Sequence, residues 1–547
     1  MNARTYLKIL LVSITAAFVF LFSNTLFSCK SLKQPSEIQK PLDYTDQDVI
    51  DNEIKNIREL QQKESTKALF RACLLKDNQI INECAAIVEA QAQTAINEKD
   101  YPLALRLYKS LVSAVKNEQA EKKFEQYYSE YYKNIPGLSF DEEKLPKTIN
   151  DCINATVTVW VDQGYVVENG NGYADIVIGS GFFIDRRGYI VTNYHVISEV
   201  VNPKRKTTCK LFVKLPSDME KKIPAKVVGY DSVMDLALLK VDSYEPDFVF
   251  ALGSSSELEV GDKISAIGTP IGLEGTLTSG IISSTSRSLI TMGKVFQIDA
   301  AVNSGNSGGP LIDSNKKVQA VVFAGMLQYQ GLNFAIPVEY LKLELPLLYR
   351  GEKFKHCWLG AFGHTKKIRN NNEGLEVQYV MPGGSASYTG LEIDDVIICA
   401  DGVSVATLED FHNICMKYES GTIITCTYLR NGQENQALLY LDKRPDAPLK
   451  EIYASDFVDD AFIPILGIKM VRSSTINKKS YKIEYVLEGS IADQNGFSEN
   501  DNLELIDVSF DDKNEICYVA LSIERRKKGL LNFQMGLATS YDSPNYF

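Results

Sequence analysis

The chain has 547 residues, 45% of them hydrophobic and 23% charged, which is enough for several domains that each bury an apolar core. This composition excludes a peptide, a collagen-like protein and a disordered chain. The 58 basic and 70 acidic residues give a formal net charge of -12, and a surface of that sign argues against nucleic acid as a partner.

The N-terminal segment is typical of an export signal. Arg4 and Lys8 precede an apolar run at 9–22, which is shorter than the roughly twenty apolar residues that span a bilayer. We predict a cleaved signal peptide over residues 1–28, with an uncleaved signal anchor as the alternative. The four residues ending at Cys29, Leu-Phe-Ser-Cys, resemble a bacterial lipobox and imply a lipid on Cys29; an ordinary signal with an incidental cysteine is the other interpretation. The expected location is the bacterial cell envelope, in the periplasm or at the surface, with a membrane anchor.

A tether and a helical domain are predicted next. Residues 29–44 are largely polar and contain two prolines, as a tether would. Residues 45–135 contain a single proline, Pro102. Apolar residues recur in this range at steps of three and four. This pattern predicts three or four antiparallel helices. The stretch 100–108 resembles the first helix of a tetratricopeptide hairpin, which would imply protein binding; a helical spacer is the alternative.

Short strands separated by glycine turns dominate residues 148–350. The expected strands are 155–161, 176–184, 189–192, 211–215, 225–228 and 236–241. A helix is expected at 338–349. Many short strands at close spacing indicate a β-barrel or a β-sandwich.

Two titratable residues within this region are candidates for catalysis. His195 follows a strand, and its imidazole could accept a proton from a hydroxyl near pH 7. Asp235 stands at the head of the apolar strand 236–241, where its carboxylate could fix the imidazole tautomer and stabilise the imidazolium. Alone, such a histidine is more often a packed residue and such an aspartate a turn cap.

A glycine-rich turn presents one hydroxyl, that of Ser307. Gly305 and Gly308 allow strained dihedrals, so the N–H groups of Gly305 and Ser307 can converge as an oxyanion hole. The order His, Asp, Ser, with separations of 40 and 72 residues in one strand-rich region, predicts a catalytic triad with Ser307 as the nucleophile.

Four motifs carry a family resemblance. They are Gly-Ser-Gly-Phe-Phe-Ile-Asp from 179, Thr-Asn-Tyr-His-Val from 192, Asp-Leu-Ala-Leu-Leu-Lys-Val from 235 and Gly-Asn-Ser-Gly-Gly-Pro-Leu from 305. They resemble the HtrA/Deg family of trypsin-fold serine proteases. The resemblance implies a double β-barrel with the cleft between the barrels, a peptide bond as substrate and a homotrimer. It assigns His195 as base, Asp235 as its orienting group and Ser307 as nucleophile.

Two departures from the family pattern fall near the predicted cleft. Ser304 stands where the family usually has proline, and Thr-Pro-Ile-Gly at 269–272 replaces the more familiar Asn-Pro-Phe-Gly. The position six before the serine faces the specificity pocket in this fold, and here it is Ala301. We therefore expect cleavage after small or medium apolar residues.

Residues 351–547 contain a degenerate internal repeat that resembles two tandem PDZ domains. The first C-terminal domain is expected at 351–446 and the second at 455–547. The resemblance assigns capture of a peptide carboxylate to the backbone amides of Leu359 and Gly360, with a strand edge that accepts the peptide. The first domain is therefore expected to bind C-terminal peptides with an apolar last residue. The second either binds peptides or packs against a neighbour and binds nothing.

The cysteines and histidines do not form a recognisable metal site. The ten cysteines include no CxxC pair, and the four histidines do not cluster with them at ligand spacing. We expect no structural metal, no cofactor and no complete disulfide framework, since acyl transfer by a triad needs only side chains and an oxyanion hole.

The predicted fold is therefore multidomain: an α-helical N-terminal region, a trypsin-like double β-barrel protease domain at 148–350 and two C-terminal PDZ-like α+β domains. The function expected from it is an exported, membrane-anchored serine endoprotease that hydrolyses unfolded or misfolded proteins. The PDZ-like domains would tether substrates or regulate the protease. The alternative is a non-catalytic scaffold or chaperone that binds partners through its helical and PDZ-like domains.

Overall fold

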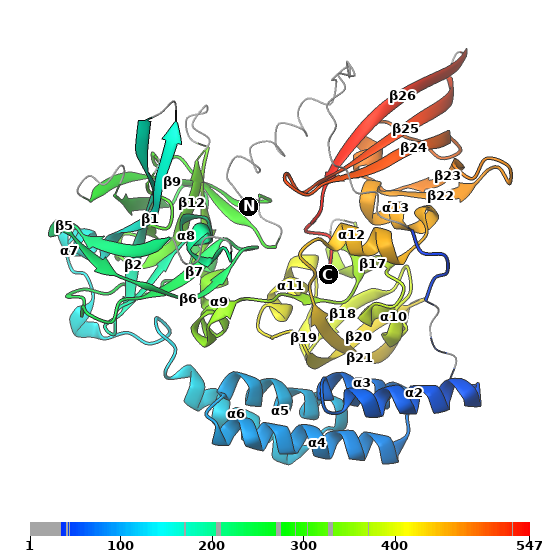
Figure 1. The fold of residues 1–547 in the computed structure, drawn as a ribbon, viewed down its shortest axis with the longest axis horizontal. Helices are drawn as coiled ribbons and strands as arrows, with labels where there is room; N and C mark the ends of the chain where they lie inside the picture. Colours follow the sequence, from blue (N-terminus) through cyan, green and yellow to red (C-terminus); the bar gives the residue numbers. More distant parts are fainter. Residues whose placement is uncertain are drawn as a thin grey trace. The chain divides into compact units, whose positions relative to one another are not determined.

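The computed structural model describes most of the chain as two compact units (Figure 1). The described residues are 34–39, 42, 44–168, 171–203, 209–269, 275–289, 292–303, 305–325, 332–369, 371–527 and 529–547. The predicted signal peptide, Cys29, Ser304 and residues 270–272 lie outside them. One unit is Glu125–Lys355; the other joins the preceding helices, up to Phe124, with His356–Phe547.

The helical region contains five helices, so the prediction of three or four is wrong. They are α2 (Gln47–Leu60), α3 (Ser65–Leu75), α4 (Asn78–Asn97), α5 (Tyr101–Val115) and α6 (Glu118–Tyr132). Lys76 and Lys116 end α3 and α5 in the left-handed conformation, with φ of 59° and 52°. Glycine usually takes this position, so its absence hides these helix ends in the sequence. Asp77 and Asp100 cap the starts of α4 and α5 with their carboxylates.

The first β-layer of the Glu125–Lys355 unit is an eight-stranded sheet with the order β14-β6-β7-β3-β2-β1-β4-β5. Its strands are β1 (Thr156–Glu168), β2 (Asn171–Asp185), β3 (Tyr189–Thr192), β4 (Lys210–Leu215), β5 (Asp218–Pro224), β6 (Lys226–Asp231), β7 (Leu236–Lys240) and β14 (Glu352–Lys353). In β4 the alternate residues Leu211, Val213 and Leu215 are buried, as the period-two pattern predicts. A short helix, α8 (Tyr194–Val201), follows β3.

The second β-layer of this unit is a closed barrel with the order β10-β13-β12-β11-β8-β9. Its strands are β8 (Lys263–Gly268), β9 (Thr276–Arg287), β10 (Val295–Ile298), β11 (Pro310–Ile312), β12 (Val318–Gly325) and β13 (Asn333–Pro337). Apolar side chains such as Ile264, Ile298 and Leu311 fill its interior. Helix α9 (Val338–Arg350) follows directly, close to the predicted 338–349.

The first C-terminal domain is a sheet with the order β15-β21-β20-β18-β17-β16 and two helices. Its elements are β15 (Cys357–Trp358), β16 (Ala361–Ile368), β17 (Asn371–Val380), α10 (Ser385–Thr389), β18 (Val396–Ala400), β19 (Val403–Ser404), α11 (Leu408–Cys415), β20 (Thr422–Arg430) and β21 (Gln433–Lys443). Strand β19 pairs with β18.

The second C-terminal domain is a five-stranded antiparallel meander preceded by two helices. Its elements are α12 (Pro448–Ser455), α13 (Val458–Leu466), β22 (Ile468–Arg472), β23 (Ser480–Val486), α14 (Ile491–Gln494), β24 (Asn502–Asp511), β25 (Ile516–Lys527) and β26 (Gly529–Ser540). Strands β24, β25 and β26 follow one another directly. In the described residues, no helix of this domain corresponds to α11 of the first domain.

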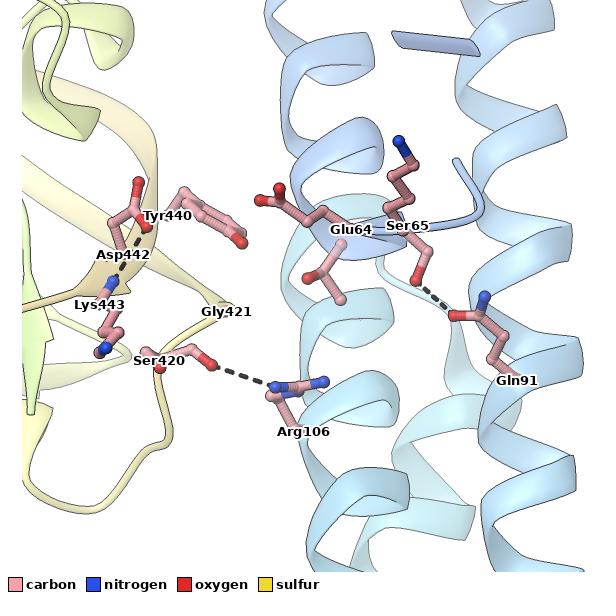
Figure 2. A pocket seen from close by; sticks show the side chains of 11 residues that line it. Glu64, Ser65, Gln91, Arg106, Ser420, Gly421, Tyr440, Asp442 and Lys443 are labelled. Carbon is pink, nitrogen blue, oxygen red and sulfur yellow. Dashed lines mark hydrogen bonds between the residues drawn. The ribbon is translucent and has the colours of Figure 1, made fainter. Parts of the chain in front are cut away.

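Helix α5 packs on β20 of the first C-terminal domain. The Ser110 hydroxyl accepts the buried N–H of Ile423 at 3.1 Å and donates to the Arg106 carbonyl. The Arg106 guanidinium donates to the carbonyl oxygen of Ser420 at 3.2 Å, as Figure 2 shows. The helices therefore hold a strand of this domain through a buried main-chain contact.

Helix α3 contacts β21 of the same domain. Phe70 stacks on Tyr440 with ring centroids 5.6 Å apart, and Lys67 pairs with Asp442 at 3.1 Å. A cavity of about 260 Å³ lies between the helices and the domain (Figure 2). The first C-terminal domain thus contacts both α3 and α5.

The predicted tether is described only from Gln34 onward. The Gln34 side chain accepts the N–H of Val458 at 3.1 Å and donates to the carbonyl of Asp456 at 3.2 Å. It therefore lies against the start of α13. Among the described residues, no helix is long and apolar enough to cross a membrane. None of the nine cysteines in this part of the chain forms a disulfide.

Candidate active site

The pairing of β3 with β7 brings His195 and Asp235 together. Because the strands are antiparallel, Thr192, at the end of β3, pairs with Ala237, the second residue of β7. His195 falls in the first turn of α8, and the Asp235 carboxylate binds it twice. One oxygen accepts the His195 main-chain N–H at 2.8 Å, and the other lies 2.7 Å from Nδ1.

Asp235 has an unusual backbone that fits this role. Its φ is +58°, in the left-handed region that Asp tolerates better than most residues. Its carbonyl oxygen accepts the N–H of Tyr194 at 3.2 Å and the side-chain amide of Asn193 at 2.9 Å. These contacts fix the carboxylate against the imidazole.

The protonation of His195 depends on Asp235. Burial by itself lowers the pKa of His195, but the charge of Asp235 and its hydrogen bond outweigh burial and raise the pKa above 6.5. The His195 side chain is still 24% exposed. Its Nε2 atom has no hydrogen-bond partner among the described residues, so it is available to another group.

The Ser307 turn combines free and engaged amides. Gly305 and Gly308 have φ of 106° and 85°, which only glycine adopts without strain. The Gly308 N–H donates to the Val322 carbonyl at 2.7 Å. No acceptor within the described part of the chain takes the N–H of Gly305 or Ser307. These two amides are the predicted oxyanion-hole donors.

The Ser307 hydroxyl donates to the carbonyl oxygen of Phe323, on β12, at 3.3 Å. No hydrogen bond joins this hydroxyl to His195 in the described residues. The structure thus brings His195 and Asp235 together directly and gives the Ser307 hydroxyl a main-chain partner.

Ser180, on β2, was not predicted as a site residue, yet it braces the Ser307 turn. Its main-chain N–H donates to the Ser307 carbonyl at 2.8 Å, and its hydroxyl donates to the Gly305 carbonyl at 2.6 Å. The same hydroxyl accepts the N–H of Thr269 at 3.0 Å. Ser180 therefore connects the eight-stranded sheet to two segments of the closed barrel.

Glycines on both sides of this brace allow the close approach. A Cβ on Gly179 would lie 2.7 Å from the Val196 side chain and 3.1 Å from the Ser307 oxygen. One on Gly308 would lie 2.3 Å from the Ser180 oxygen. The Gly-Ser-Gly motif was the signal for this contact, but a motif alone does not show what its serine touches.

Ala301, predicted to face the specificity pocket, is exposed. Its carbonyl oxygen accepts the Thr278 hydroxyl at 2.8 Å, so main-chain contacts fix the segment. Residues 270–274 and 326–331 lie outside the described part of the chain.

The Leu359-Gly360 turn in the first C-terminal domain directly precedes the edge strand β16. Gly360 has a φ of 75°, and the next amide, that of Ala361, donates to the main-chain oxygen of Phe547 at 3.0 Å. In the second C-terminal domain, the corresponding Gly467 N–H donates to the carbonyls of Phe462 and Ile463 as the cap of α13. That amide is therefore already occupied.

Four segments of the chain match known protein families. Residues 179–321 match the trypsin-like peptidase domain, 365–441 the PDZ domain and 449–541 the TP0546 family PDZ domain. Residues 48–131 match a domain of unknown function. The matches confirm the predicted order of a helical region, a trypsin-like protease domain and two PDZ domains.

Curated relatives match up to 62% of this chain. A "probable periplasmic serine endoprotease DegP-like" of Bartonella henselae is 32% identical over 351 residues, which cover 62% of this chain and 67% of that protein. A protein of the same name from Pseudomonas putida is 32% identical over 281 residues, covering 49% and 56%. A solved structure titled "HtrA-type protease AlgW with decapeptide" is 26% identical, covers 54% of this chain and 96% of its own, and has a TM-score of 0.45. The curated relatives show that this chain belongs to the DegP-like family of serine endoproteases.

Proposed function

We propose that this chain hydrolyses peptide bonds of unfolded or misfolded proteins with His195, Asp235 and Ser307 as its catalytic triad. The observation that carries the proposal is the double contact between the Asp235 carboxylate and His195. A carboxylate on Nδ1 keeps the other ring nitrogen, Nε2, ready to accept a proton.

The first chemical step forms an acyl-enzyme. The Ser307 hydroxyl turns from the Phe323 carbonyl toward Nε2 of His195, gives up its proton there and attacks the carbonyl carbon of the peptide bond. The carbonyl oxygen becomes an oxyanion, which the Gly305 and Ser307 amides stabilise. The imidazolium then protonates the leaving amine as the C–N bond breaks.

The second step releases the other product. A water molecule takes the place of the amine, gives its proton to His195 and attacks the acyl carbon. The imidazolium then returns this proton to the Ser307 oxygen as the acyl C–O bond breaks, so Ser307 leaves as the alcohol. Asp235 stabilises the imidazolium in both steps. Neither step requires a metal or a cofactor.

Substrate preference is assigned to the segment that includes Ala301. A methyl side chain supplies no carboxylate for a basic substrate residue, so we expect cleavage after small or medium apolar residues. Digestion of a peptide library tests this preference, and rapid cleavage after Lys or Arg would contradict it.

The two C-terminal domains are assigned different roles. The first has an edge strand, β16, together with helix α11, the two walls that a PDZ peptide site needs. The second lacks a counterpart of α11 in its described residues, and the amide of Gly467 caps a helix. We therefore assign substrate tethering or regulation to the first domain and a packing role to the second.

The proposed location is the cell envelope. The signal-like N-terminus supports export, and the curated relatives named above are described as periplasmic. We propose that the membrane anchor is a lipid on Cys29 or an uncleaved signal. We also propose that the chain forms a homotrimer. Mass spectrometry of the mature N-terminus would distinguish the two anchors.

Casein digestion tests the proposed activity. Ser307→Ala should lower the rate by about 10⁶. Ser256→Ala is the matched control, because Ser256 is an exposed serine outside the site, and it should leave the rate unchanged. A wild-type protein as inert as Ser307→Ala would favour the scaffold or chaperone alternative.

A further inference from the structure

Residues 545–547 pair antiparallel with the edge strand β16 of the first C-terminal domain, with Tyr546 bridged to Phe362, after a turn closed by the Tyr546 N–H on the Ser543 carbonyl at 3.2 Å. Phe547 and Ala361 exchange two main-chain hydrogen bonds, each 3.0 Å long. The Gly363 N–H donates to the Asn545 carbonyl at 3.0 Å, and the Asn545 side chain donates to the Gly363 carbonyl at 2.9 Å. This strand addition on β16 is how a PDZ domain holds a peptide. Figure 1 shows the red end of the chain returning to this domain.

The Phe547 side chain fills an apolar pocket of the domain. It is 3% exposed and belongs to the same buried cluster as Leu359, in the turn before β16, and Phe411, on α11. Its ring lies edge-on to that of Phe411, with centroids 5.4 Å apart. A Cβ on Gly363 would lie only 3.1 Å from this ring, so the pocket is closely fitted to an aromatic side chain.

Tyr546 belongs to a different cluster from Phe547, the core of the second C-terminal domain. Its ring packs against Trp358 and Phe362 at centroid distances of 6.2 and 5.8 Å. Its hydroxyl donates to the Pro464 carbonyl at 3.2 Å. Such alternation of neighbouring side chains is expected of a strand, so both residues are held by side chain as well as by backbone.

A buried cation holds the main chain of the same segment. The Arg444 side chain is 3% exposed and pairs with the Asp542 carboxylate at 2.6 Å. It also donates to the carbonyls of Tyr546, at 3.1 Å, and Ser543, at 3.4 Å. Within the described residues, Asp542 is the only ion-pair partner of Arg444.

His412, on α11, contacts the segment from the other wall. Its Nε2 lies 3.3 Å from the Tyr546 carbonyl oxygen. Burial, together with the charge of Arg444, lowers the pKa of His412 to about 3, so the neutral ring donates its N–H to this oxygen. The groove therefore offers a strand edge, an aromatic pocket, a buried cation and a neutral donor.

We propose that residues 542–547 are an intramolecular ligand of the first C-terminal domain, and that external peptides enter its groove only by displacing them. The competing ligand is a peptide with an aromatic residue at the position of Phe547 and an acidic residue five positions earlier, at the position of Asp542. The proposal rests on the peptide-binding role assigned to this domain above. It adds that residues 542–547 occupy the groove when no external peptide is bound.

Binding of a labelled peptide tests the proposal. The probe is a synthetic peptide with the sequence of residues 542–547, followed by fluorescence polarisation on the full chain carrying Ser307→Ala, so that proteolysis plays no part. The double variant Tyr546→Ala/Phe547→Ala should bind the probe at least about tenfold more tightly, because the competing segment no longer holds the groove. Phe533→Ala, on exposed Phe533 of β26, is the control and should leave the affinity unchanged.

A second measurement avoids substitutions in the segment, which could weaken the fold. Hydrogen exchange of the Phe547 amide, in the Ser307→Ala chain, should accelerate when excess probe is added, while exchange of the Ala361 and Gly363 amides stays slow. A probe that binds without affecting Phe547 exchange, and binds the double variant no better, would overturn the self-ligand. A probe that fails to bind even the released double variant, with its secondary structure intact, would overturn the peptide-binding role itself.

Discussion

Ser180 donates its main-chain N–H to the carbonyl oxygen of Ser307 at 2.8 Å, across the boundary between the two β-layers of the protease unit. Its hydroxyl holds the Gly305 carbonyl at 2.6 Å, so one serine fixes both residues that carry the proposed oxyanion-hole amides. The orientation of those amides therefore depends on how the two layers meet.

Ser180→Ala should lower kcat with little change in KM. Without the hydroxyl, the Gly305 carbonyl and the Thr269 N–H lose a buried partner, and a misplaced oxyanion hole costs about 10²-fold in rate. Steady-state kinetics on a chromogenic peptide measure both constants. Ser265→Ala, which removes an exposed Ser–Ser hydrogen bond on β8, is the matched control. An equal rise in KM with kcat preserved would show that Ser180 does not position the turn.

The acid limb of the pH profile reports on His195. The base must be neutral, and Asp235 raises the pKa of His195 above 6.5, so kcat/KM should reach half its plateau at a pH above 6.5. Asp235→Asn should lower kcat by about 10⁴ and move this limb to lower pH, because burial then acts without the opposing charge. Asp242→Asn, on the surface, should change neither. A limb that stays in place in Asp235→Asn would contradict the assigned coupling.

The hydrogen bond from the Ile423 N–H of β20 to the Ser110 hydroxyl of α5 should protect the Ile423 amide from exchange with solvent. Ser110→Ala removes the acceptor of the buried Ile423 N–H, at a cost of about 1–3 kcal/mol. The Ile423 amide should therefore exchange faster with solvent. Thr94→Ala is the control, because Thr94 makes the same kind of back-bond to the Ala90 carbonyl on an exposed helix face. Unchanged exchange at Ile423 would show that the helices do not hold β20.

Asp456 gives the second unit a pH-dependent stability. Burial raises the pKa of Asp456 from 3.8 to about 6, against the hydrogen bonds from Tyr379 and the Phe457 N–H, which lower it. The folded chain thus binds this proton more tightly than the unfolded chain. Its contribution to stability is present below about pH 4 and is lost as pH rises through about 6.

Asp456→Asn should flatten this change, which we expect to be on the order of 1–3 kcal/mol. Urea unfolding of the second unit between pH 4 and 7, followed in the full chain, measures it. Asp512→Asn, at a carboxylate whose side chain is 69% exposed, is the comparison. The same pH dependence in the parent and in Asp456→Asn would refute the assignment.

The order of domains was predictable because each has a local signature. Alternating apolar residues specify strands such as β4, and the glycine-rich turn at Ser307 is readable as a motif. The number of helices was not predictable, because two helices end at Lys76 and Lys116. These residues take the left-handed conformation, where a sequence usually has glycine and so shows the end of a helix.

Contacts between distant segments were also beyond sequence patterns. Ser180 meets Ser307 only after two β-layers have folded and met, and Phe547 reaches Ala361 across 186 positions of sequence. No pattern in the sequence around Arg444 indicates that its charge pairs with Asp542. Such contacts depend on tertiary approach and not on periodicity.

Labelling with a fluorophosphonate, followed by intact-mass analysis and peptide mapping, tests the central claim most directly. Such a reagent reacts with a serine hydroxyl that a neighbouring base activates. We predict one adduct per chain, on Ser307, and its loss in His195→Ala. Digestion of casein by a protein that carries no adduct on Ser307, or an adduct that persists unchanged in His195→Ala, would contradict the account.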